Sequence, residues 1–421
     1  MSATQNRVKQ IAEHLRASPS NASRVATKIG VKSPNDVVIV SALRTPITRA
    51  RRGPFKDTLA DELLAAVLKA VLERTKLNPA LVDDVVVGNV LPPGGGATAA
   101  RMAALVAGLP DTTSVMTCNR QCSSGLQAVA QVAAAIQNGT IEIGIGAGVE
   151  TMTQHYGAGA MGATSEKAQD FPPAADCLMP MGITSENVAR EFNVSRTKQD
   201  AFAAESHRRA EAAQKAGLFK DEIVPVTVQI EDKEGKTHTI TVSQDDGIRP
   251  GTTAEKLGKL KPAFSDDGTT TAGNASQVSD GAAAVLLMRR AKAQELGLPV
   301  LGKFITSATV GVPPNVMGIG PAFAIPRAAQ QAGIRVGDID VVELNEAFAS
   351  QAVYSMEYLS LDPARVNPKG GAIALGHPLG CTGARQIATL LPELKRQNKR
   401  VGAVSMCIGT GMGMAAIIER E

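Results

Sequence analysis

One segment decides the fold: Cys118-Asn119-Arg120-Gln121-Cys122-Ser123-Ser124-Gly125-Leu126-Gln127-Ala128-Val129-Ala130. Its last six residues have a similar counterpart later in the chain. Gly125-Leu126-Gln127-Ala128-Val129-Ala130 aligns with Gly383-Ala384-Arg385-Gln386-Ile387-Ala388, at an offset of 258 (383 minus 125). Upstream, Asp84-Val85-Val86-Val87-Gly88-Asn89 aligns with Asp340-Val341-Val342-Glu343-Leu344-Asn345, at an offset of 256 (340 minus 84). Two matches in one order at nearly one spacing indicate a duplicated domain.

Both copies have the pattern of alternating strands and helices. In the first copy, strands are predicted at 37–40, 84–90 and 141–149, and helices at 59–74 and 125–138. This alternation is typical of a sheet that helices cover on both faces. The sequence therefore predicts an α/β fold in which two halves build duplicated α-β-α-β-α layers.

A region of different character separates the two copies. It contains Met-, Gly- and Pro-rich loops around 172–182, a charged helical stretch at 197–217, and a polar strand pair at 224–231 and 237–243. It is too long for an ordinary loop. We expect four parts: an N-terminal extension (1–34), a first half (35–151 plus 265–300), an inserted loop domain (152–264) and a second half (301–421).

Composition excludes several classes of protein. Apolar residues make up 44% of the 421 residues, enough for a large core, and the net charge of +4 carries no nucleic-acid signature. The five cysteines are odd in number and irregularly spaced, which favours free thiols in a reducing compartment. We expect no metal site, because no His/Cys cluster has ligand spacing. We also expect no membrane span, because no apolar run approaches about 18 residues.

The N-terminal extension contains an amphipathic pattern. Arg7 and Val8, followed after five residues by His14 and Leu15, resemble the nonapeptide of an N-terminal peroxisomal targeting signal. Such a signal is an amphipathic helix that docks in a groove of an import receptor. The prediction is a protein of the peroxisome matrix. A mitochondrial presequence and a plain helical extension are the alternatives.

Cys122 is a candidate nucleophile because of its position. The strand-like 114–117 precedes it and a predicted helix follows, so Cys122 is expected at a helix N-terminus. The dipole there favours an anion, and we expect a lowered thiol pKa. A buried, inert cysteine is the alternative.

Three other segments carry candidate chemistry. His377 aligns with Asn119 of the first copy and lies in a Gly/Pro turn; it could activate a thiol, or simply be packed. Cys407 follows a predicted strand, and the backbone N–H of Gly409 could line an oxyanion hole, although a hairpin also explains such a turn. Asn345 follows a strand and could hold a water, donate to an oxyanion or cap a turn.

Together these blocks resemble the thiolase family. The resemblance rests on five motifs that occur in order: N-R-x-C-S-S-G, G-N-A-S-x-x-S-D-G-A (273–282), N-E-A-F-A, G-H-P and C-x-G. It runs from about Val37 to Glu419, which is nearly the whole folded part.

The resemblance implies an acyltransferase that cleaves 3-ketoacyl-CoA with CoA through an acyl-Cys122 intermediate. By the same resemblance Cys407 is the acid and base, His377 activates Cys122, and Asn345 with a water supports the enolate oxygen. Gly409 and Cys122 would form a second oxyanion hole. Ser276 would contact pantetheine, Arg249 the nucleotide, and Phe264 and Phe348 the pantetheine and acyl path. CoA would be a co-substrate, with no other cofactor, and at least a homodimer is expected.

Three alternatives stay open at this point. A thiolase specific for acetoacetyl-CoA has the same motifs and differs in acyl-pocket size. A ketosynthase has a related fold but typically uses a Cys-His-His set, whereas only His377 of the five histidines lies in a motif. A non-catalytic lipid-binding or scaffold protein would tolerate loss of Cys122, His377 or Cys407.

Overall fold

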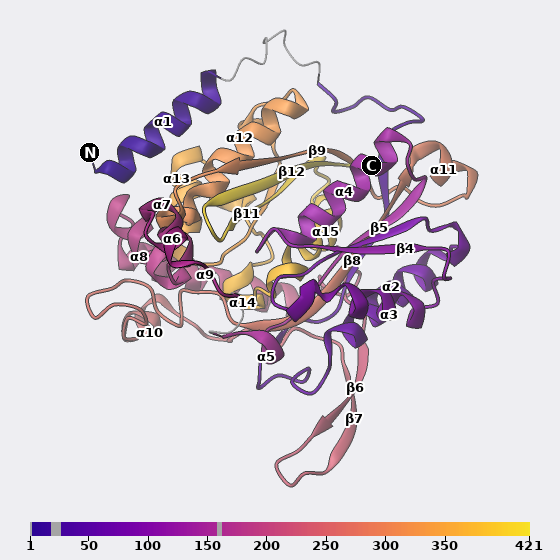
Figure 1. Cartoon of the computed structure of the whole chain (residues 1–421), viewed down its shortest axis with the longest axis horizontal. Helices are drawn as coiled ribbons and strands as arrows, with labels where there is room; N and C mark the ends of the chain where they lie inside the picture. Colours follow the sequence, from indigo (N-terminus) through magenta and orange to yellow (C-terminus); the bar gives the residue numbers. More distant parts are fainter. Residues whose placement is uncertain (1, 18–26, 158–161) are drawn as a thin grey trace.

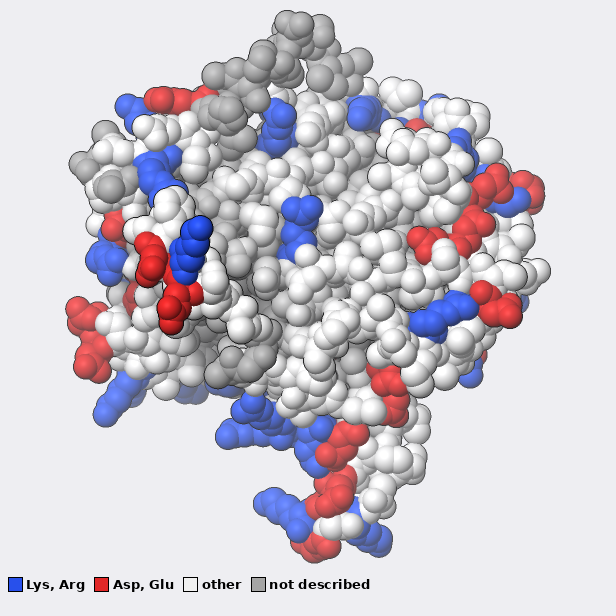
Figure 2. All heavy atoms as spheres, in the orientation of Figure 1, with Lys and Arg blue, Asp and Glu red and all other residues white. Residues whose placement is uncertain are grey.

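A computed structural model describes residues 2–17, 27–157 and 162–421, without the side chains of Ala3 and residues 14–17 (Figure 1). Strands from both halves lie in the middle of the molecule, and helices lie between and outside them (Figure 1). Charges of both signs are scattered over the face shown in Figure 2.

The sheet of the first half has the order β1-β8-β5-β3-β4, and β2 also pairs with β8. β3 is parallel to β4 and β5, whereas β8 is antiparallel to β5 and β1. Apolar residues fill β1, β5 and β8, which are buried along nearly their whole length because both faces are covered. Their bounds are β1 Val37–Arg44, β2 Thr48–Arg49, β3 Asp84–Gly88, β4 Ser114–Cys118, β5 Ile143–Thr151 and β8 Ser279–Arg289.

The second half repeats this order as β9-β12-β11-β10. β10 is parallel to β11, and β12 is antiparallel to β11 and β9, so each strand corresponds to one of the first half. β1 pairs with β9 at Val38↔Lys303 and joins the two sheets. The predicted duplication is confirmed. The bounds are β9 Gly302–Gly311, β10 Val341–Leu344, β11 Val401–Ile408 and β12 Met412–Arg420.

Helices form the remaining layers, and three apolar cores hold them in place. α2 (Ala60–Thr75) and α3 (Ala97–Val106) cover the outer face of the first sheet. α4 (Ser124–Asn138) and α15 (Leu379–Arg396) share a central core with both sheets, and α12 (Gly320–Ala332) covers the outer face of the second. The layered α/β prediction is therefore confirmed.

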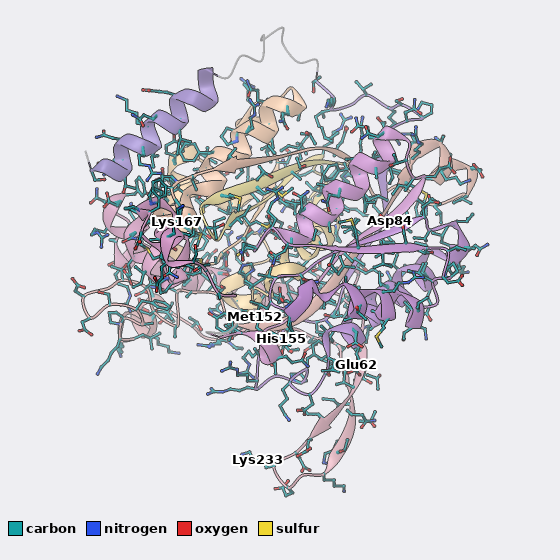
Figure 3. All side chains as sticks on the ribbon, viewed as in Figure 1. Glu62, Asp84, Met152, His155, Lys167 and Lys233 are labelled. Carbon is teal, nitrogen blue, oxygen red and sulfur yellow. The ribbon has the colours of Figure 1, made fainter. Side chains whose placement is uncertain are left out.

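Residues 152–264 contain a separate two-stranded sheet. β6 (Val226–Glu231) and β7 (Thr237–Val242) form the predicted polar strand pair, which projects from the body with Lys233 at its tip (Figure 3). The charged helix is α9 (Arg196–Lys215). The prediction of loops at Pro172 and at Met181 is wrong. Pro172 opens the helix α7 (Pro172–Ala175), because the fixed φ of proline suits a first helical turn, and α8 (Met181–Glu191) begins after the N-cap Pro180.

Shorter helices connect these elements. They are α5 Met152–His155, α6 Glu166–Gln169, α7 Pro172–Ala175, α10 Ala254–Gly258, α11 Arg290–Glu295, α13 Ala349–Leu359 and α14 Ala372–Leu375. In the part of the chain that the structure describes, no helix is long and apolar enough to cross a membrane.

The extension folds as the helix α1 (Ala3–Ala17). Val8 is 8% exposed and packs on the outer core of the second half, whereas Arg7 is exposed. The side chains of His14 and Leu15 lie outside the described residues.

Candidate active site

Cys122 lies in a tight turn between β4 and α4, which we call the first elbow (residues 118–125). Gln121 adopts a left-handed conformation with φ 48°. The Arg120 backbone N–H donates to Ser124 Oγ at 2.9 Å, and that hydroxyl donates to the Gln121 carbonyl at 2.6 Å. These bonds fix a turn that places Cys122 two residues before the helix.

The Cys122 thiol is not activated by its position alone. Burial raises the pKa of Cys122 to about 11, although the backbone N–H groups of Gly409 and of Cys122 itself act in the opposite direction. The expected lowering of this pKa is therefore wrong, because desolvation outweighs the helix N-terminus. At neutral pH the resting thiol keeps its proton, and a nearby base has to remove it before attack.

His377 lies in the second elbow (residues 376–383), at the start of α15. Gly376 has φ 109°, and a Cβ there would lie 2.5 Å from Ser279 Oγ, so only glycine fits. Ser279 Oγ accepts the His377 backbone N–H at 2.9 Å. The imidazole is buried, with 4% of the residue exposed.

The His377 ring is held at both nitrogens. Asn345 Nδ2 lies 3.3 Å from Nε2, and Thr382 Oγ1 lies 2.6 Å from Nδ1. An amide N–H can only donate, so Nε2 carries a lone pair and Nδ1 donates to Thr382. Burial, together with the charge of Arg385, lowers the pKa of His377 to about 3. The ring is therefore neutral at pH 7 and can accept a proton at Nε2.

Cys407 lies at the end of β11 and is fully buried. Its Sγ donates to Gln351 Oε1 at 3.4 Å. Met317, Ala347 and Phe348 pack around it. Burial and, after it, the charge of Cys122 raise the pKa of Cys407 well above its usual range. This sulfur is a proton donor in the resting site.

The two elbows meet at the crossing of α4 and α15. A Cβ on Gly125 would lie 2.5 Å from the Gly380 carbonyl oxygen, so this contact requires glycine. Glu150 of the first half accepts the Gly380 backbone N–H at 2.9 Å. Cys122 in turn faces the Gly409 N–H, next to Cys407. Side chains distant in the sequence thus converge on one centre.

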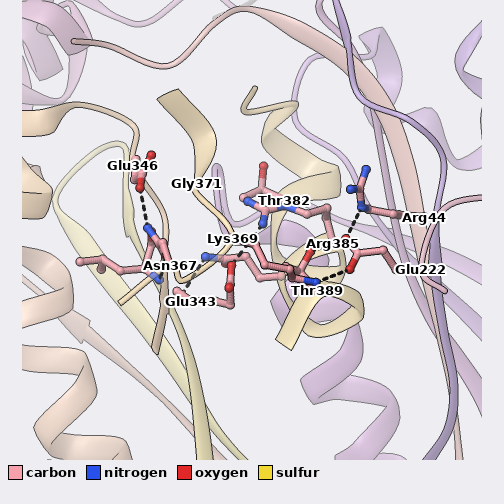
Figure 4. A network of polar contacts seen from close by, with 12 residues as sticks. Arg44, Glu222, Glu343, Glu346, Asn367, Lys369, Gly371, Thr382, Arg385 and Thr389 are labelled. Carbon is pink, nitrogen blue, oxygen red and sulfur yellow. Dashed lines mark hydrogen bonds and ion pairs between the residues drawn. The ribbon is translucent and has the colours of Figure 1, made fainter. Parts of the chain in front are cut away.

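A buried polar network reaches α15, the helix that begins in the second elbow, through Thr389, which donates to Glu222 at 2.8 Å (Figure 4). Glu222 accepts from Arg44 Nε at 2.7 Å and from Lys369 Nζ at 2.8 Å. Glu346, next to Asn345, accepts from Asn367 at 2.7 Å and from the Ile373 N–H at 3.1 Å. Burying such charges is costly unless they are paired. The network joins both halves and the inserted region, and the sequence did not predict it.

Three of the predicted CoA contacts lie beside this centre. The Ser276 N–H donates to the Ala347 carbonyl at 2.9 Å. Phe264 meets Phe348 edge to face at 6.4 Å. Arg249 is exposed in another loop, where its backbone N–H donates to His207 Nδ1 at 3.2 Å.

Two family models together match nearly the whole folded part of the chain. The model described as "Thiolase, N-terminal domain" matches residues 37–291, and "Thiolase, C-terminal domain" matches 298–420. The chain belongs to the thiolase family. This thiolase is 61% identical over 388 residues to the peroxisomal 3-ketoacyl-CoA thiolase B of Rattus norvegicus, covering 92% of this chain and 91% of that protein. It is 55% identical to the peroxisomal 3-ketoacyl-CoA thiolase of Yarrowia lipolytica, covering 99% and 100%.

Solved structures show the same fold. The dimeric peroxisomal thiolase of Saccharomyces cerevisiae is 51% identical with a TM-score of 0.86, covering 93% of this thiolase and 99% of that chain. The acetyl-CoA acetyltransferase of Bacillus anthracis is 38% identical with a TM-score of 0.83, covering 92% and 99%.

Proposed function

We propose that this thiolase cleaves 3-ketoacyl-CoA with CoA, giving acetyl-CoA and a shortened acyl-CoA, as a step of peroxisomal β-oxidation. The observation that carries the proposal is the meeting of the two elbows: one holds an oriented imidazole that is neutral at pH 7, and the other holds Cys122 beside the Gly409 N–H, two residues from Cys407. The names of the relatives in rat and Yarrowia supply the substrate class and the compartment.

The first half-reaction forms the acyl-enzyme. His377 Nε2 takes the Cys122 proton, and the thiolate attacks the 3-keto carbon. The bond between the α and β carbons breaks, so the acyl group stays on Cys122 and acetyl-CoA leaves as its enolate. The Cys407 S–H protonates the α carbon of that enolate and becomes a thiolate. Asn345 and the protonated His377 stabilise the enolate oxygen.

The second half-reaction returns every group to its starting state. The Cys407 thiolate takes the proton of the incoming CoA thiol. The CoA thiolate attacks the acyl-Cys122 carbonyl, and the N–H groups of Cys122 and Gly409 stabilise the oxyanion. Cys122 leaves as a thiolate and recovers its proton from His377. CoA is thus a co-substrate, and the cycle needs no further cofactor.

CoA recognition is assigned to four residues. Ser276 and Phe348 lie beside the Asn345 loop and suit the pantetheine arm, and Phe264 extends this apolar wall. Arg249 is an exposed cation that suits the nucleotide phosphates.

Cleavage of acetoacetyl-CoA alone is the second candidate, favoured by the likeness to an acetyl-CoA acetyltransferase. Thiolysis rates across 3-ketoacyl-CoA substrates from four to sixteen carbons, roughly the span of fatty acyl chains, separate the two. Rates that stay high beyond the shortest member support the proposal. Activity confined to acetoacetyl-CoA contradicts it.

We place a homodimer interface on the free edge of the first sheet. β4 is the last strand there, and Met116 on β4 is 43% exposed. Met102 (54%) and Val106 (75%) on α3 extend this apolar surface. An edge strand with exposed apolar side chains favours pairing with a second chain. The variant Val106→Asp should lower the mass measured by light scattering from dimer towards monomer. An unchanged mass would contradict the interface.

The helix α1 is assigned to a peroxisomal import receptor. Its fold as a helix and the exposure of Arg7 support this role. Val8 is packed on the body, so the helix has to leave the second half before a receptor groove can take its apolar stripe. Loss of peroxisomal import in an Arg7→Glu variant, with activity unchanged, is the expected result. Normal import would contradict the assignment.

A further inference from the structure

The surroundings of the two active-site sulfurs have opposite polarity. Cys122 faces backbone N–H donors, whereas Cys407 faces an amide oxygen, that of Gln351 at 3.4 Å. A donor stabilises a thiolate, and an acceptor stabilises a thiol. This contrast gives Gln351, which the sequence motifs do not identify, a place in the chemistry.

The orientation of the Gln351 amide is fixed by the backbone. Oε1 also accepts the Ala347 backbone N–H, at 3.2 Å. A flipped amide would set two N–H donors against each other, so the oxygen must face Cys407. The side chain is fully buried, and Nε2 has no hydrogen-bond partner among the described residues. Burying the Nε2 donor without a partner is costly. The fold accepts this cost and keeps both hydrogen bonds of Oε1.

We propose that Gln351 is a positioning residue that keeps Cys407 in its protonated form, ready to act as the proton donor of the active site. The inference rests on the proposed role of Cys407. In that role the S–H gives its proton to the enolate carbon, and the resulting thiolate takes a proton from CoA. The Gln351 oxygen favours the protonated state of Cys407 before the first transfer and after the second, when the sulfur carries its proton.

Few other groups could set this protonation state. Cys122 is the ionisable neighbour whose charge bears on Cys407. Met317 and Phe348 are apolar residues that cluster with the sulfur, and Gln351 is the side chain with a described hydrogen bond to it. Changing Gln351 therefore changes the one polar side-chain contact described for this thiol.

The test measures exchange of the α protons of acetyl-CoA with solvent deuterium, because this exchange needs Cys407 to move a proton. Gln351→Met keeps the length of the side chain and removes the acceptor. We expect exchange to slow about tenfold, part of the 10²–10⁴ that a positioned acid or base contributes. In Gln351→Met the rising limb of the exchange rate against pH should move to lower pH, because the Cys407 thiolate no longer faces the Gln351 oxygen, which repels it. Gln351→Glu keeps an acceptor oxygen and should move the limb to higher pH.

Controls separate this claim from a packing effect and from the proposed function. Gln199→Met removes another fully buried amide, one whose described contacts include no sulfur, and should leave the exchange profile in place. Cys407→Ala should abolish exchange. Exchange that survives Cys407→Ala would overturn the role of Cys407 itself. A second outcome would overturn the Gln351 proposal alone. In it, Cys407→Ala loses exchange, but the two Gln351 variants leave the rising limb of the pH profile unmoved or shift it in the same direction.

Discussion

The first and second elbows occupy equivalent places in the two halves, at the starts of α4 and α15, yet they hold different chemistry. The first presents Cys122 through a left-handed Gln121, and the second presents His377 through a left-handed Gly376. The aligned position in the first elbow is Asn119. Among the described residues its amide contacts the Gln121 N–H and the Val90 carbonyl. The comparison teaches that duplication supplied two converging helix starts, and that the residue presented at each, Cys122 or His377, divides the roles of nucleophile and base.

Burial acts on both elbows in the same sense, because it disfavours charge. It raises the pKa of Cys122 and lowers the pKa of His377, so both side chains are neutral at rest. A neutral thiol beside a neutral base is inert until a substrate arrives and the proton moves. The following variants test this division, from the largest expected effect to the smallest.

Removing the nucleophile of the first elbow should have the largest effect. Cys122→Ala should lower kcat for thiolysis by about 10⁴-fold or more, because no other group can carry the acyl chain. Loss of 3-ketoacyl-CoA absorbance measures the rate. Retention of more than a tenth of the activity would show that the first elbow is not the acyl carrier.

Asn345→Ala tests the support of the imidazole at Nε2. Asn345 is fully buried, and its Nδ2 is the donor that lies 3.3 Å from His377 Nε2. We expect kcat to fall about 10²–10³-fold, the cost of one oxyanion donor. Asn119→Ala in the first elbow is the matched control and should stay within about twofold. An equal fall of kcat in Asn345→Ala and Asn119→Ala would contradict different roles for the two elbows.

Thr382 tests the other side of the ring. Thr382→Val removes the acceptor of Nδ1–H and should lower kcat about tenfold, the worth of one hydrogen bond, with KM for CoA little changed. Thr382→Ser keeps the hydroxyl and should restore the rate. If Thr382→Val and Thr382→Ser give the same kcat, the contact between Thr382 and His377 does not set the tautomer of the imidazole.

The smallest effect concerns stability against pH. His377 has a pKa of about 3 when folded and about 6.5 when unfolded, so the unfolded chain takes up the extra proton in between. Its contribution is complete above about pH 6.5 and is lost as the pH falls towards 3. Glu150, with a pKa raised to about 7, acts in the opposite sense, so only the difference between variants is informative. The unfolding midpoint of His377→Gln should fall less than that of the parent between pH 6.5 and 4.5. Parallel curves would contradict a buried neutral imidazole.

Local patterns predicted most of the fold. The apolar run at Val37 and the matched glycines at 125 and 383 gave the strands, the central helices and the duplication, because these depend on neighbours in sequence. The helix at Met181 was missed, since Met, Gly and Pro together also fit a loop. Pairing of Arg44 with Glu222 depends on the folded chain, and no local pattern indicates it.

The sequence motifs name the residues on which the proposed mechanism rests, whereas the electrostatics of the site were not predicted. Motifs pointed to Cys122, His377, Cys407 and Asn345, and the structure brings these segments together. The pKa of Cys122 was predicted in the wrong direction, because the depth of burial is not visible in the sequence. Thr382 and Gln351 were missed for a related reason: each acts through a contact with one catalytic side chain. Thr382 lies in α15 just after the G-H-P motif, and Gln351 lies in α13 just after the N-E-A-F-A motif. This nearness to the motifs is the one signal in the sequence that could have identified them.

The central claim is that one thiol, that of Cys122, carries the acyl group while the other four remain free. Brief incubation with a 3-ketoacyl-CoA in the absence of CoA, followed by acid quench and peptide mass spectrometry, tests it directly. The account predicts an acyl mass on the peptide containing Cys122, localised to that residue, and its loss when CoA is added. An acyl group on Cys407 or Cys177 instead, or none at all, would contradict it.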